Sequence, residues 1–145
     1  MNSKLYDAQD ALKAILDDAE GLAGITKSLG TPLKLSDLKD VVWVSGEVED
    51  WNQDYRVTSL LAKDETFVLR VHCLTSITGD YRAARNRVKS FAEAVEAVVS
   101  ENYTLNGTVE LAQIRSGAME EARLDERRHQ ALITLYISCR AWLTA

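Results

Sequence analysis

Three observations predict an α+β fold for this chain of 145 residues. Residues 3–22 and 81–101 place apolar side chains at the three- and four-residue spacing of amphipathic helices. Four other segments alternate apolar and polar residues as strands do, and they form pairs that hairpins can join. The predicted order is therefore α-β-β-α-β-β, with an antiparallel four-stranded sheet and two amphipathic helices on one face.

The N-terminal part of the chain is predicted to be a helix followed by a linker. Apolar residues of the helix form one stripe: Leu5, Ala8, Leu12, Ile15, Leu16, Ala19 and Leu22. A glycine-rich stretch with the sole proline, Pro32, follows, so residues 23–40 are predicted to be the linker. The sheet and the second helix are then expected within residues 41–143, which makes residues 1–145 a single domain.

The first two strands flank a long connection. "DVVWVSGEVEDW" predicts a strand that is buried on both faces at its start, and "TFVLRVHCLTS" predicts the second. Residues 49–65 lie between them and are too many for a tight turn. This projecting segment either extends both strands into a hairpin or forms a functional loop.

The second helix and the last two strands complete the sheet. Asp80 is a suitable N-cap for the helix, whose apolar residues repeat at helical spacing from Tyr81 to Val99. An Asn106-Gly107 turn leads into the third strand. Residues 115–129 are polar and charged, which predicts a loop or hairpin tip, and "QALITLYISCRAWL" alternates for longer than any other segment.

The charge and composition limit the classes of function. The net charge is -5, with 7 basic and 13 acidic residues in positions 1–66 and 10 basic and 9 acidic residues in positions 67–145. An acidic total argues against nucleic acid as the main ligand. No apolar stretch is long enough to span a bilayer, and the start lacks the pattern of a secretion signal, so we expect a cytoplasmic protein without a membrane partner.

The sequence offers no catalytic or metal-binding motif, and the chain is predicted not to be an enzyme and to need no cofactor. His72 and Cys73 are neighbours in a strand, so their side chains leave opposite faces of the sheet and do not favour one shared metal ion. His129 and Cys139 lack the spacing of paired ligands. Cys73 and Cys139 lie in apolar-alternating runs and are predicted to be buried free thiols rather than nucleophiles.

Two groups of residues are candidates for contacts with other subunits. Arg82, Arg85 and Lys89 form one stripe on the second helix, and Arg82 lies in the first turn, where the helix dipole disfavours a cation. This stripe is either an ordinary solvated face or a contact with acidic groups of a neighbouring subunit. Trp51 and Tyr55 either fold back on their own sheet or form the centre of an interface.

The order of these motifs resembles the tail terminator, or tail completion, family of long-tailed bacteriophages. The strand end "LRVHCLTS", the turn "ITGDY", the helix "RAARNRVKSFAEAV" and the closing "RRHQALITLYISCRA" carry the resemblance, which is clearest over residues 66–141. The chain departs from that pattern at its proline, because family members often place one just before the first strand, whereas Pro32 lies well upstream of Val41.

The resemblance implies a structural virion protein in the neck of the virus, assembled in the host cytoplasm. Such proteins form a ring, commonly a hexamer, that caps the tail tube, stops its polymerisation and offers the surface for the filled head. The implied partners are copies of the chain itself, the tail tube protein and the head-closure protein, while DNA passes through the lumen without specific binding. The interface residues expected on this basis are Trp51, Asp54, Tyr55, Arg56, Arg82, Arg85 and Lys89.

Two alternatives remain open from the sequence. Within the virion, the chain is alternatively another neck component, such as a head-closure or adaptor protein. Outside the virion, a small α+β domain of this kind is alternatively a ligand-binding or regulatory domain, which would need a pocket with convergent polar groups.

Overall fold

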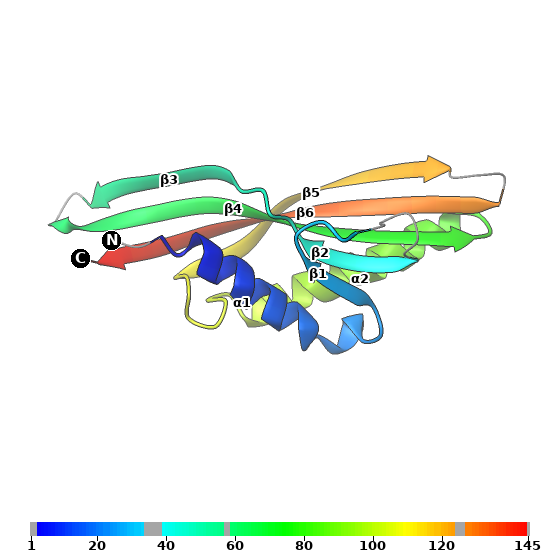
Figure 1. Cartoon of the computed structure of the whole chain (residues 1–145), viewed down its shortest axis with the longest axis horizontal. Helices are drawn as coiled ribbons and strands as arrows, with labels where there is room; N and C mark the ends of the chain where they lie inside the picture. Colours follow the sequence, from blue (N-terminus) through cyan, green and yellow to red (C-terminus); the bar gives the residue numbers. More distant parts are fainter. Residues whose placement is uncertain (1–2, 34–38, 57–58, 124–126, 145) are drawn as a thin grey trace.

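The computed structural model describes residues 3–33, 39–56, 59–123 and 127–144. Its elements follow one another as α1 (Leu5–Asp17), a 3₁₀ turn η1 (Glu20–Leu22), β1 (Thr26–Leu29), β2 (Asp40–Val44), β3 (Glu49–Arg56), β4 (Ser59–Thr78), α2 (Tyr81–Glu101), β5 (Leu111–Arg123) and β6 (Arg128–Thr144). Figure 1 shows an elongated molecule in which the sheet extends beyond the helices at the end that carries β3, while α2 runs along the sheet towards the other end.

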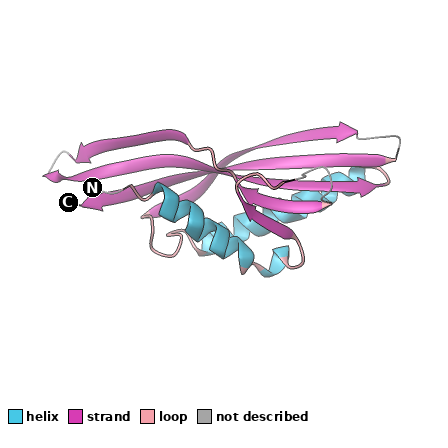
Figure 2. Ribbon diagram, viewed as in Figure 1, coloured by secondary structure: helices cyan, strands magenta, loops and turns pink. Residues whose placement is uncertain are grey.

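A pair of long antiparallel strands forms the spine of the sheet (Figure 2). β4 and β6 pair continuously from Ala62 opposite Thr144 to Thr78 opposite Arg128. At about 3.3 Å per residue this ladder is roughly 55 Å long. β5 pairs with β6 on one side of the spine, and on the other side β3 pairs with the first part of β4 while β2 pairs with its second part.

The expected four-stranded antiparallel sheet is wrong. The described residues form six strands in the order β1-β2-β4-β6-β5, with β3 paired to β4, and β1 runs parallel to β2. The order of elements is consequently not α-β-β-α-β-β. β1 lies in the stretch 23–40 that was predicted to be linker, where "TKSL" is too short and too polar to alternate visibly.

Two polar segments of the chain form hairpins. The segment 49–65 adopts the hairpin alternative, since β3 pairs with β4 in antiparallel register. The polar stretch 115–129, predicted to be a loop or a hairpin tip, lies largely in strands: β5 runs on to Arg123, and β6 begins at Arg128. β3 and the outer part of β5 supply no described residue to the apolar core, so their sequences lack a continuous apolar face while backbone pairing holds the strands.

The expected placement of the two helices on one face of a four-stranded sheet is also wrong. α2 packs against the central strands β4 and β6 and against the start of β5. α1 instead packs mainly against the edge strand β1, its neighbour β2 and α2. The reason is that β1 widens the sheet, and α1 covers this added edge.

Helix α2 begins where the sequence predicts. The backbone N–H of Ala83 donates a 2.8 Å hydrogen bond to Asp80 Oδ1, which confirms the predicted cap. The buried side chains of the helix recur at helical spacing and are Ala84, Val88, Phe91, Ala92, Val95 and Val99. They join one apolar core that also contains residues of α1 and alternate residues of β2, β4 and β6.

A second, smaller apolar cluster lies on the opposite face of the sheet. It consists of Val41, Trp43 and Leu74, with Leu132 packed against them. β2 is thus buried on both faces, as its apolar start predicts, but it ends at Val44 rather than extending towards Trp51. The Asn106-Gly107 turn is also confirmed, because both residues have positive φ angles of 58° and 81°.

Candidate functional site

The aromatic residues Trp51 and Tyr55 lie on the β3–β4 hairpin at one end of the molecule (Figure 1). Trp51 is 57% exposed, and its indole Nε1 donates a 2.9 Å hydrogen bond to Glu65 Oε2. Tyr55 is 58% exposed, and Lys63 Nζ lies 4.7 Å from its ring centroid. Each ring is held by a polar contact and still presents most of its surface to solvent, which is a suitable geometry for docking another protein.

Two of the charged residues near these aromatic rings have the same sign and lie opposite each other. Asp54 is exposed and lies directly opposite Asp64 in the β3–β4 register, where like charges repel. Arg140 donates a 3.2 Å hydrogen bond to Asp64 Oδ2 and so partly offsets this repulsion. Arg56, the remaining predicted residue of the hairpin, is the last residue of β3, and its side chain lies outside the described part of the structure.

Glu65 is a buried carboxylate with four donors around it. Its side chain is completely inaccessible to solvent, yet it lies at the end of β4 that carries the exposed hairpin. The donors are Ser3 Oγ at 2.6 Å, Lys4 N at 2.7 Å, Gln53 Nε2 at 2.8 Å and Trp51 Nε1. The carboxylate therefore ties the start of α1 to β3 and β4.

These contacts determine the protonation of Glu65. Burial is the largest single influence and raises the pKa of the carboxyl group, but the four hydrogen bonds together outweigh it and leave the pKa below its ordinary value. The group is consequently ionised at neutral pH and acts as a structural anchor. The alternation of β4 could have predicted the burial of Glu65, because this residue belongs to the inward-facing series that continues with Phe67, Leu69 and Val71.

The basic stripe of α2 has the exposure that the sequence predicts. Arg82 and Arg85 are exposed and form no ion pair with any described residue. Lys89 is exposed too, and its Nζ lies 3.8 Å from Glu93 Oε1, a loose i,i+4 pair. These three side chains are thus available for contact with another molecule.

Arg87, which lies beside this stripe, has a structural partner. Its guanidinium donates two hydrogen bonds to the Asp40 carboxylate, and Thr75 Oγ1 donates a third, 2.7 Å long. The Arg87 guanidinium holds the pKa of Asp40 below its ordinary value, helped by Thr75, although burial acts in the opposite direction. The pair fixes α2 to the start of β2.

The two predicted groups of interface residues are not brought together. The hairpin that carries Trp51 and Tyr55 pairs with the first part of β4, whereas α2 starts only after Thr78, at the other end of that strand (Figure 1). From Glu65 to Thr78 the strand advances by roughly 40 Å. The molecule therefore presents two separate surfaces at opposite ends of its spine.

His72 and Cys73 leave opposite faces of β4, as the strand period predicts. His72 Nδ1 lies 2.8 Å from Thr134 Oγ1, and its ring centroid is 4.8 Å from that of Trp43. Burial, followed by the nearby Arg70 charge, lowers the pKa of His72. Cys73 and Cys139 are buried free thiols, and burial raises the pKa of each to about 12. Neither thiol has the exposure or the low pKa of a nucleophile.

The described residues contain no group of three or more His, Cys, Asp and Glu side chains that is arranged to hold a metal ion. In the same part of the chain, neither helix has the length and apolar character needed to cross a membrane.

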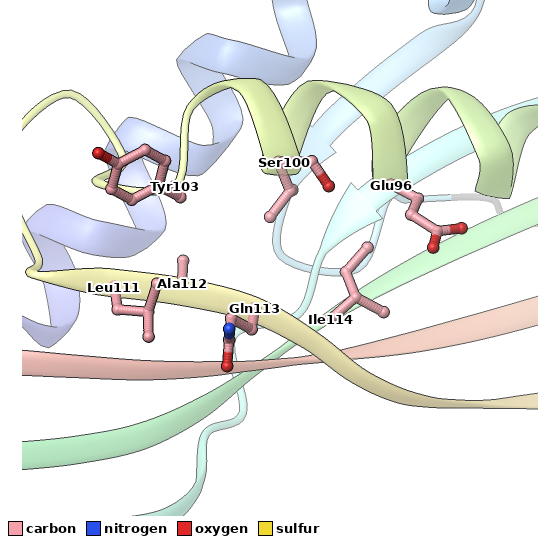
Figure 3. Close-up of a pocket in the computed structure, with 8 residues that line it drawn as sticks. Glu96, Ser100, Tyr103, Leu111, Ala112, Gln113 and Ile114 are labelled. Carbon is pink, nitrogen blue, oxygen red and sulfur yellow. The ribbon is translucent and has the colours of Figure 1, made fainter.

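A shallow groove of about 530 Å³ lies between the end of α2 and the beginning of β5 (Figure 3). Glu96 and Ser100 line it from the helix, Tyr103 from the following turn, and Leu111, Gln113 and Ile114 from the strand. Tyr103 and Leu111 are exposed, and β5 pairs only with β6 among the described strands. The outer edge of β5 is partly occupied beside the groove, because the backbone N–H of Ala112 donates a 2.6 Å hydrogen bond to the carbonyl oxygen of Tyr103.

The chain was compared with known proteins. No known protein family matches it, and no curated protein is significantly similar in sequence.

Proposed function

We propose that this chain is a structural subunit of the neck of a long-tailed bacteriophage, a tail terminator that assembles into a ring of identical copies. In this proposal the ring caps the tail tube, stops its polymerisation and offers the surface for the filled head. The motif order over residues 66–141 suggested this function, and the structure supplies surfaces that suit it.

The observation that carries the proposal is the β4–β6 spine with a hairpin at each end. At one end the β3–β4 hairpin extends beyond the helices, and at the other end β5 pairs only with β6 among the described strands, so β3 and β5 are outer strands of the sheet. Edges of this kind are a liability in a monomer because other strands can pair with them. In a ring, neighbouring subunits can cover these strand edges and bind to them.

The two surfaces suit different partners. Trp51 and Tyr55 are large, exposed aromatics held by Glu65 and Lys63, so the hairpin is the proposed contact with the tail tube protein. Arg82, Arg85 and Lys89 are exposed cations at the other end, and they are the proposed contact with a neighbouring subunit.

The charge of the chain is compatible with a lumen through which DNA passes. The net charge is -5, and a ring of such subunits would not retain phosphates as a basic channel does. We therefore expect no measurable affinity for duplex DNA at physiological salt.

Light scattering combined with negative-stain imaging of the purified protein tests the ring. The proposal predicts closed rings of uniform diameter, alone or on the ends of tail tubes. Rings that bind the head but leave tube growth unchanged would instead identify another neck component, either a head-closure or an adaptor protein. A compact monomer that binds a metabolite and never associates would overturn the proposal and favour a ligand-binding domain.

A further inference from the structure

We propose that the basic stripe of α2 docks into an acidic groove on the helical face of a second copy of this chain, so that subunits associate head to tail. This inference rests on the proposed function and names the surface that receives Arg82, Arg85 and Lys89.

The acidic groove lies where the C-terminal ends of both helices meet. It has a volume of about 340 Å³ and is lined by Asp18 and Glu20 from the end of α1 and η1, and by Glu101 from the end of α2. All three carboxylates are exposed, and none forms an ion pair with another described residue. Since the C-terminus of a helix carries a partial negative charge, two helix ends add to the negative potential of the three side chains.

The floor of this groove is closely packed. A methyl group built on Gly21 would lie only 2.8 Å from Ala94 Cβ, so the 3₁₀ turn approaches α2 as closely as a glycine allows. Ala97 and Val98 supply an apolar surface between the carboxylates. The groove is therefore a fixed depression that can hold the aliphatic stems of arginine or lysine while the carboxylates contact their charged ends.

The basic and acidic surfaces cannot satisfy each other within one subunit. Arg85 and Glu101 lie 16 positions apart on the same straight helix, which corresponds to roughly 24 Å at about 1.5 Å per residue. This separation exceeds the Debye length of about 8 Å at physiological salt. The basic stripe and the acidic groove therefore form no contact with each other in one subunit, and each complements the corresponding surface of another copy.

Arg82 and Glu101 are each placed unfavourably with respect to the helix dipole, although the Asp80 carboxylate at the N-cap offsets the cation at the start. α2 has no acidic residue in its first turn and no basic residue in its last turn, and instead carries Arg82 near its start and Glu101 at its end. Local helix stability favours the reverse placement. An arrangement that is unfavourable within the subunit but complementary between subunits is consistent with a role in association.

A contact between two different patches has a geometric consequence. Each copy offers its basic stripe to one neighbour and its acidic groove to another, which makes the interface heterologous. Such interfaces close into rings when the rotation between subunits divides a full turn. The inferred contact thus accounts for a ring without requiring any other interface.

Charge reversal tests the inference in the full chain. R82E/R85E and E20K/E101K are each expected to weaken self-association roughly 10- to 100-fold in sedimentation velocity at low salt, because attraction becomes repulsion at both sites. D7K/D10K makes the same change in net charge as E20K/E101K but lies near the start of α1, away from the groove, and is expected to associate as the wild type does. Circular dichroism confirms that each variant is folded.

Mixing the two interface variants gives the decisive result. In an alternating assembly, the reversed stripe of one variant meets the reversed groove of the other, and both remaining surfaces are native. The equimolar mixture should therefore recover wild-type association, and a chain with all four substitutions should associate on its own. Loss of association in the single variants without recovery in the mixture would overturn the inference.

Two further outcomes separate this inference from the proposed function. If the wild type forms rings and both reversed variants do so equally well, the groove is not the interface, although the ring proposal stands. If the wild type remains monomeric at every concentration in low salt, the inferred contact does not exist, and the capping of tail tubes decides the function separately.

Discussion

Trp51 donates its indole N–H to the carboxylate of Glu65 at 2.9 Å, although the tryptophan is more than half exposed and the glutamate is completely buried. The same carboxylate accepts hydrogen bonds from Ser3 and from the backbone of Lys4. The orientation of an exposed aromatic residue on the hairpin is thus linked to the attachment of the first helix. An interface that includes Trp51 would consequently be pre-organised by the fold of its own subunit.

Replacement of Glu65 by glutamine should destabilise the fold. The amide keeps the shape of the side chain but removes the charge, and it turns one acceptor into a donor that faces the existing donors. We expect the free energy of unfolding to fall by about 2–4 kcal/mol in urea titrations. Glu96→Gln, at an exposed position on α2, is the matched control and should change it by less than about 0.5 kcal/mol.

The pH dependence of stability should reflect the same carboxylate. The pKa of Glu65 is lower in the folded protein than its ordinary value of 4.5, so its ionised form stabilises the fold at neutral pH. This contribution is expected to be complete above pH 4.5 and to disappear as the pH falls through the folded pKa. Urea titrations of the wild type and of Glu65→Gln should therefore converge at low pH, and a constant difference between them would contradict the assignment.

Two neighbouring arginines should behave differently when they are replaced by alanine. Arg87→Ala removes the partner of Asp40 and should lower the free energy of unfolding by about 1 kcal/mol, a value limited by the partial exposure of the pair. Arg85→Ala removes an exposed cation without an ion-pair partner among the described residues and should change stability by less than about 0.5 kcal/mol. Self-association should show the opposite order, with the larger effect for Arg85→Ala.

Both cysteines should be unreactive in the folded protein. Burial raises the pKa of Cys73 and of Cys139 to about 12, so almost no thiolate exists at pH 8, and neither sulfur is accessible. A colorimetric thiol reagent should detect no free thiol in the native protein and two after denaturation. Rapid modification of either residue under native conditions would show that the core opens more readily than the packing suggests.

The sequence predicted those elements whose apolar residues repeat with the period of the structure they form. The second helix, its Asp80 cap and the alternation around Cys73 are examples, because burial against one core imposes that period. The strand β1 was missed, and the outer part of the β5–β6 hairpin was predicted only as a loop or hairpin tip, because both lie where little is buried. Backbone hydrogen bonds to a neighbouring strand hold these segments. Such bonds do not require apolar and polar residues to alternate, so the sequence gives no strand signal there.

Only part of the candidate site could be predicted from the sequence. The exposure of Arg82 and Arg85 follows from helix periodicity, whereas the sequence left open whether Trp51 folds back on the sheet or stays exposed. The hydrogen bonds of Glu65 were not predictable, since its donors come from residues 3, 4, 51 and 53, which only the folded chain assembles. The convergence of Asp18, Glu20 and Glu101 has the same origin.

The length distribution of tail tubes tests the central claim most directly. Tail tube protein is polymerised in the presence of the wild-type chain or of W51A/Y55A, and the tubes are imaged by negative stain. The account predicts that the wild-type chain forms a ring on tube ends and stops growth, so that tubes are short and uniform. The double variant should fold but bind tubes more weakly and leave them long. Unlimited tube growth with the folded wild-type chain present in excess would contradict the account.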